Sequence, residues 1–208
     1  HTKRMYVYAA LGGMCGISAD GEDTGKILWE STEWAPNVIA PSPVLFDTNK
    51  IFMTAGYGAG GTVIQINKTN DGFEAATLLN YEPKFGLASE QQTPILYKDH
   101  LYGILPKDAG FNRNQFVCYN VNNLETPVWQ SGKTNRYGLG PYMIINDKIL
   151  ILNDEGTLSL IEASQKEFTL VSQMKVFDGH DAWGPFAFAD GYLLLRDSKN
   201  LYCLDLRP

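Results

Sequence analysis

One short pattern occurs four times in this chain: a proline, an apolar strand, a polar turn of two or three residues, and a second apolar strand. The four copies lie at residues 43–53, 94–104, 141–151 and 185–195. Twenty Gly and ten Pro, spread between short apolar runs, favour a chain that turns often. The repeat therefore predicts an all-β fold made from one unit that is used several times.

The spacing of the repeats predicts the size of that unit. The four prolines are 51, 47 and 44 residues apart, within or close to the period of one four-stranded blade of a β-propeller. After each hairpin a third strand recurs, and it ends in Asn, Asp or Glu, which can accept backbone N–H bonds in the next turn. These third strands are 62–67, 115–120, 157–162 and 200–205. We predict five blades, at 1–36, 37–88, 89–136, 137–180 and 181–208.

The first and last of these blades are incomplete in sequence. Residues 4–10 and 14–18 match the second and third strands of a blade, and the chain stops after the third strand of the last one. The expected total is eighteen strands, and three strands at each end overfill one shared blade. We therefore expect the C-terminal part of a seven- or eight-bladed propeller, with the missing blades N-terminal to His1. The alternative is a five-bladed ring with two three-stranded blades.

Composition excludes several classes of protein. The chain has 44% hydrophobic, 12% aromatic and 19% charged residues, as expected of a well-ordered globular protein. A net charge of −6 and a pI near 5.0 argue against a nucleic-acid partner, which would need clustered Lys and Arg. No run approaches the roughly 18 apolar residues of a membrane span, so no transmembrane segment is expected, and residues 1–8 do not form a signal peptide.

The three cysteines do not form a metal motif. Cys15, Cys118 and Cys203 are far apart in sequence, and none has a second cysteine at CxxC spacing. Each lies in a predicted third strand, where a small buried residue suits the blade core. We predict that all three pack in the core.

The stretch Asp-Thr-Gly-Lys-Ile-Leu-Trp at 23–29, the proline strands and the strand at 201–205 resemble the repeats of the PQQ-like, or quinoprotein-type, β-propeller superfamily. One branch of this superfamily binds pyrroloquinoline quinone and Ca²⁺ in a complete eight-bladed ring. Another contains non-catalytic bacterial scaffolds, similar to the lipoprotein subunit of the outer-membrane assembly machinery. The chain lacks the adjacent Cys pair of many of the dehydrogenases, so the resemblance implies a scaffold, periplasmic or extracellular, with no cofactor.

Two motifs that suggest ligand sites fail a closer test. Residues 56–61 satisfy G-x-G-x-x-G, but a strand follows them where a dinucleotide site needs a helix, so they are predicted to form a hairpin connection. Calcium loops that start at Asp20 or Asn67 have Ser31 or Leu78 at the twelfth position, where a bidentate Glu is required. We predict no metal site.

The candidate binding residues lie in the connections that meet on one rim of a propeller. His180 beside Asp181 could act as a general base, as a ligand, or simply fill a turn. The full candidate set mixes aromatic, amide and charged groups, as protein and carbohydrate surfaces do. It comprises Tyr57, Gln91, Gln92, Phe111, Asn112, Arg113, Arg136, Tyr137, His180, Asp181 and Trp183. Trp29 and Trp129, at the ends of fourth strands, are expected to be packing anchors between blades.

The sequence thus predicts a non-catalytic scaffold that binds a protein, a small molecule or a carbohydrate on one rim. One alternative is a PQQ-dependent oxidoreductase whose PQQ and Ca²⁺ site lies partly outside this chain. A second is a carbohydrate-binding or polysaccharide-processing accessory, which requires Trp183, Tyr137 and Tyr57 to be exposed together.

Overall fold

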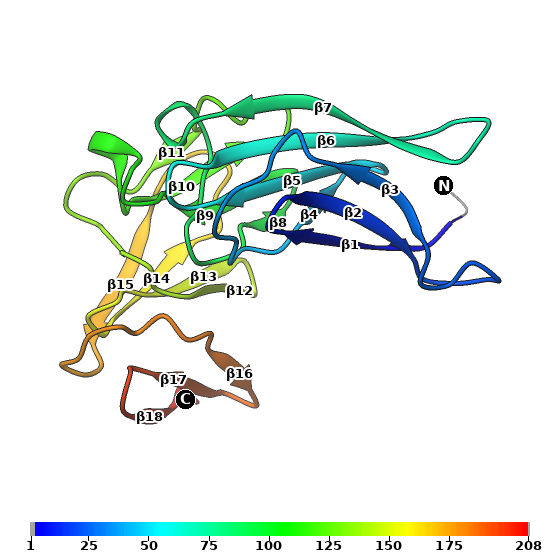
Figure 1. Ribbon diagram of the computed structural model, residues 1–208. Coiled ribbons are helices and arrows are strands. Elements are labelled where there is room, and N and C mark those ends of the chain that lie inside the picture. Colours follow the sequence, from blue (N-terminus) through cyan, green and yellow to red (C-terminus); the bar gives the residue numbers. More distant parts are fainter. Residues whose placement is uncertain (1–2, 208) are drawn as a thin grey trace.

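The computed structural model describes residues 3–207, which fold into five antiparallel sheets arranged one beside the next (Figure 1). The first sheet consists of β1 (Met5–Ala10), β2 (Gly13–Ser18) and β3 (Ile27–Ser31). The second consists of β4 (Val44–Phe46), β5 (Lys50–Ala55), β6 (Gly60–Lys68) and β7 (Phe73–Tyr81). The third consists of β8 (Ile95–Tyr97), β9 (His100–Ile104), β10 (Phe116–Asn120) and β11 (Trp129–Gln130).

The fourth sheet consists of β12 (Tyr142–Ile145), β13 (Lys148–Leu152), β14 (Thr157–Glu162) and β15 (Leu170–Lys175), and the fifth of β16 (Ala187–Ala189), β17 (Tyr192–Arg196) and β18 (Leu201–Asp205). In every sheet, strands that follow one another in sequence are hydrogen-bonded neighbours. The five sheets are the blades of a β-propeller, which confirms the predicted fold class. Residues 3–207 contain the eighteen strands that were expected, in blades of three, four, four, four and three.

Local turn chemistry fixes the hairpin in each repeat. In blade 4 the two residues of the turn, Asn146 and Asp147, have φ of 48° and 59°, and Ile145 pairs with Lys148 across it. In blade 5 the same place is taken by Asp190 and Gly191, with φ of 50° and 79°. Two-residue hairpins need positive φ at both positions, which Asn, Asp and Gly adopt most readily. The polar dipeptides in the repeat therefore set the strand register.

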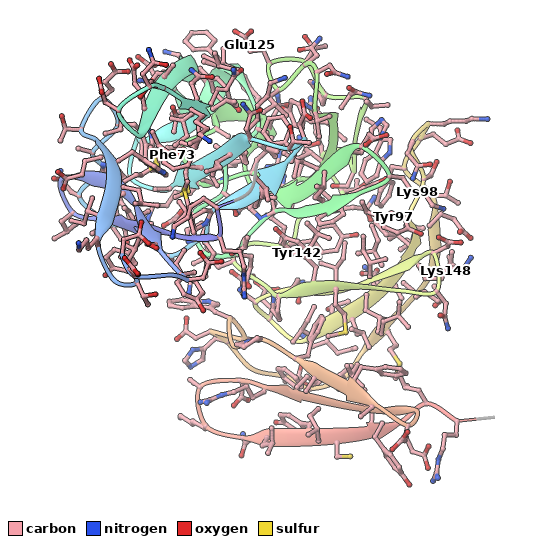
Figure 2. All side chains as sticks on the ribbon, turned by 90° about the vertical axis from the view of Figure 1, so that its right-hand side faces the viewer. Phe73, Tyr97, Lys98, Glu125, Tyr142 and Lys148 are labelled. Carbon is pink, nitrogen blue, oxygen red and sulfur yellow. The ribbon has the colours of Figure 1, made fainter. Side chains whose placement is uncertain are left out.

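The core lies between the blades. Trp129 and residues of β9 and β10 pack against Ile149 and Ile151 of the next blade. Trp29 is buried in the same way with Met53 of β5. Both tryptophans are therefore the packing anchors that the sequence predicted. Figure 2 shows Tyr142, another member of the Trp129 cluster, on the first strand of blade 4.

The prediction that all three cysteines are core residues is wrong for Cys203. Cys118 is buried, Cys15 is half-buried, and Cys203 is exposed. Cys203 lies on β18, the last strand of a three-stranded blade, and its side chain shares the outer face with exposed Leu194 and Leu201. Among the described residues nothing packs on this face, whereas Cys118 has a blade on either side.

Candidate functional site

The meander topology gathers two kinds of connection on one face of the blades. Successive strands alternate in direction, so the connection from second to third strand and the connection to the next blade lie at the same end. We call this end the loop face; among its segments are 56–59, 82–94, 105–115, 131–141, 153–156 and 176–186. All eleven predicted site residues lie in these segments. At the opposite end, Tyr97 and Lys98 contact Asp147 of the next blade, and Figure 2 shows both near Lys148.

Gln92 joins the loops of three blades. Its side-chain Nε2 donates to the backbone oxygen of Leu139 at 3.2 Å and to that of Trp183 at 2.9 Å. Its own backbone oxygen accepts a bond of 2.6 Å from Ser89 Oγ. Since these bonds occupy the amide nitrogen, Gln92 fixes the loop face in place and is less suited to ligand recognition. The neighbouring Gln91 is half-buried.

Arg136 braces the turn that carries Phe111. Its Nη2 donates to the Phe111 backbone oxygen at 3.1 Å, its Nη1 donates to the Arg113 backbone oxygen, and its Nε donates to the Lys133 backbone oxygen at 3.2 Å. The turn is a short 3₁₀ helix, η2 (Gly110–Asn112). Phe111 is 88% exposed at its tip, the largest exposed fraction among the large apolar side chains of the described chain. An apolar ring exposed to water in this way is energetically unfavourable, and covering it with another apolar surface would lower the free energy.

Tyr57 lies on the adjacent loop of blade 2 and is 64% exposed. The Nζ of Lys107 lies 4.6 Å from the centre of its ring, a cation–π contact. The backbone N–H of Gly58 donates to Asp108 Oδ2 at 2.6 Å, which ties the loop of Tyr57 to the loop of Phe111. The structure therefore places two exposed aromatic side chains, Tyr57 and Phe111, on loops that are bonded to each other.

Sequence reasoning missed Lys107 and its partner Glu90. Lys107 Nζ lies 3.1 Å from Glu90 Oε1, and this hydrogen bond raises the pKa of the lysine. Glu90 is buried, and its Oε2 has no hydrogen-bond partner among the described residues. A Cβ on Gly56 would lie 2.5 Å from Glu90 Cγ, so the glycine is needed to seat the glutamate. The sequence offered one indication of Lys107, because it lies in the same connection between strands as the candidate residue Phe111.

Tyr137 is buried, so it does not belong to the exposed surface to which the sequence assigned it. Its ring is only 1% exposed and packs edge-on against Phe116, with ring centres 6.2 Å apart. The backbone N–H of Tyr137 donates to the Asn114 oxygen at 2.7 Å, which draws the residue into the space between blades 3 and 4. The carbohydrate alternative needed Tyr137, Tyr57 and Trp183 exposed together, and that requirement is not met.

The His180–Asp181 pair lies in solvent at the blade 5 end of the loop face. The two side chains are joined by a contact of 2.7 Å between His180 Nδ1 and Asp181 Oδ2, and both are largely exposed. Half-buried Asp154 lies near this loop, since its backbone oxygen accepts from Ala182 at 3.3 Å, and burial raises the pKa of its carboxyl group. Residues 3–207 contain no group of three or more His, Cys, Asp or Glu side chains able to hold a metal ion.

Comparison with known proteins supports the fold alone. No protein-family model matches the sequence, and no curated protein matches it. Solved structures do match. BamB from Moraxella catarrhalis has a TM-score of 0.51 at 12% identity, over 98% of this chain and 69% of that one. Sqt1 from Saccharomyces cerevisiae has a TM-score of 0.52 at 12% identity, over 98% and 68%.

The computationally designed protein Ika8 has a TM-score of 0.56 at 11% identity, over 98% of this chain. The chain spans 58% of the length of Ika8. BamB is a PQQ-like propeller and Sqt1 a WD40-like one, so the matches support the propeller fold without choosing between the two repeat types. No helix among residues 3–207 is long and apolar enough to cross a membrane.

Proposed function

We propose that this chain is a non-catalytic scaffold of the PQQ-like type whose loop face binds a partner protein. The observation that carries the proposal is the braced turn of Phe111. Its ring is exposed, while two nitrogens of the Arg136 guanidinium donate to the backbone oxygens of Phe111 and Arg113 and hold the turn. Aromatic side chains on rigid loops are the usual anchors of protein interfaces, because little conformational freedom is lost when they are covered.

The alternatives have less support. An exposed His180–Asp181 pair is by itself a weak basis for catalysis. For the PQQ-dependent alternative, the described residues contain no cluster of three or more acidic side chains that could hold Ca²⁺. We also propose a bacterial periplasmic or extracellular location, as the sequence resemblance implies.

Site-specific photocrosslinking in the cells that make the protein tests this function. A photoreactive phenylalanine analogue replaces Phe111 or Tyr57 in two variants. In a third it replaces Lys98, which is exposed at the opposite end of blade 3. The same partner is expected to crosslink from positions 111 and 57 and not from 98. Crosslinks only from 98, or from none of the three, would contradict a binding role for the loop face.

A further inference from the structure

We propose that the part of the loop face around Phe111 binds an acidic, aromatic-containing segment of the partner protein. This inference rests on the proposed function and adds the chemistry of the segment. The residues concerned, which we call the basic patch, are Tyr57, Lys107, Phe111, Arg113, Lys133 and Arg136.

The contacts already described hold the basic patch together. Arg136 bonds the backbone of Phe111, Arg113 and Lys133. Lys107 lies over the Tyr57 ring, and Gly58 bonds Asp108 in the Lys107 loop. Three loops from blades 2 and 3 and from the connection to blade 4 therefore form one surface.

The charge of this surface opposes that of the whole chain. Arg113, Lys133 and Arg136 form no ion pair with any carboxylate within residues 3–207, and only Lys107 does, with Glu90. The carboxylates of the same loops are fewer: Glu90 is buried against Lys107, and Asp108, which keeps its charge, accepts the Gly58 N–H. A chain with a net charge of −6 thus presents an excess of cations around Phe111, the most exposed large apolar side chain among the described residues.

The excess of cations and the exposed aromatic rings together indicate the chemistry of the partner segment. Arg side chains bind carboxylates through charge-assisted hydrogen bonds, and a locally positive surface attracts and orients an acidic partner. Exposed rings of Phe111 and Tyr57 gain from apolar or aromatic contact. A nucleic acid would also be attracted by cations, but the excess here is small and the rest of the chain is acidic, so a short acidic peptide fits better.

Fluorescence polarisation with labelled peptides tests the inference. The probe is the hexapeptide Glu-Phe-Glu-Glu-Phe-Glu, and its controls are Lys-Phe-Lys-Lys-Phe-Lys and a single-stranded oligothymidine. We expect the acidic peptide to bind at least about tenfold more tightly than either control, and more weakly as salt rises. The variants Arg113→Glu and Phe111→Ala should each weaken binding by about tenfold, as expected of interface anchors. The variant Lys98→Glu, an exposed charge change at the opposite end, should leave it unchanged.

Equal binding of the three probes, stronger binding of the oligonucleotide, or no effect of Arg113→Glu would overturn the inference. Because Arg113 and Phe111 are exposed, these variants should keep the wild-type thermal unfolding temperature. An unchanged temperature would show that a loss of binding comes from the altered side chain and not from unfolding. If position 111 crosslinks a partner but the acidic peptide does not bind, the scaffold function stands and the charge of its partner is refuted. If neither occurs, both fail.

Discussion

Replacing Phe116 with Ala should be among the most damaging single changes in this protein. Phe116 is fully buried on β10, and its ring centre lies 5.1 Å from that of Tyr142, 6.1 Å from Trp129 and 6.2 Å from Tyr137. A buried aromatic ring removes about 150–250 Å² from water, which at about 25 cal/mol per Å² corresponds to about 4–6 kcal/mol. Measured Phe→Ala changes in cores cluster at about 3–5 kcal/mol.

Urea unfolding followed by tryptophan fluorescence would measure the effect. The signal comes partly from Trp129, which packs on Phe116, so the probe reports directly on the boundary between blades 3 and 4. Phe85→Ala is the matched control, since Phe85 is 54% exposed and its loss should change the free energy of unfolding by less than about 1 kcal/mol. A loss below about 1 kcal/mol for Phe116→Ala would refute the view that packing between blades holds the fold.

Three further predictions concern buried polar groups and the loop face. Thr54 Oγ1 donates to Gly60 O and accepts from Ser89 N–H, both at 2.8 Å, so Thr54→Val should cost about 1–3 kcal/mol in urea unfolding; an unchanged midpoint would contradict this. The Asp197 carboxylate accepts the N–H groups of Lys199 and Asn200, which lowers its pKa, so its stabilisation is present above the unfolded pKa of about 3.9 and is lost as the pH falls through the lower folded value. The thermal unfolding temperature of Asp197→Asn should therefore lie below that of the wild type at pH 7, and the difference should shrink as the pH falls below about 3.9; a constant difference would contradict the assignment. Arg136→Ala should speed tryptic cleavage after Arg113, because the backbone oxygens of Phe111 and Arg113 lose their hydrogen bonds to the guanidinium. Mass spectrometry would measure the cleavage rate, and an unchanged rate would show that other contacts hold the turn.

The pattern of strands and turns was readable because it is local. Alternating apolar residues with a polar dipeptide specify a hairpin from a dozen neighbouring residues, so the repeat predicted the eighteen strands and their grouping. The burial of Trp29 and Trp129 followed from the same pattern, since each lies in the last strand of its blade. Strand alternation alone decides which connections share an end, so the candidate residues could be assigned to one face from the order of the strands.

Exposure within the loops depended on contacts between blades, which no local pattern encodes. Phe111 and Tyr137 are both aromatic residues in polar connections, yet the first is held outside by Arg136 and the second fills the space between two blades. The pairing of Lys107 with Glu90 joins residues 17 positions apart through the fold. Cys203 is exposed because burial in a blade requires a neighbouring sheet, whereas strand formation requires only the strand beside it. The sequence by itself therefore determined the blades, and only the tertiary structure decided which side chains are free to bind.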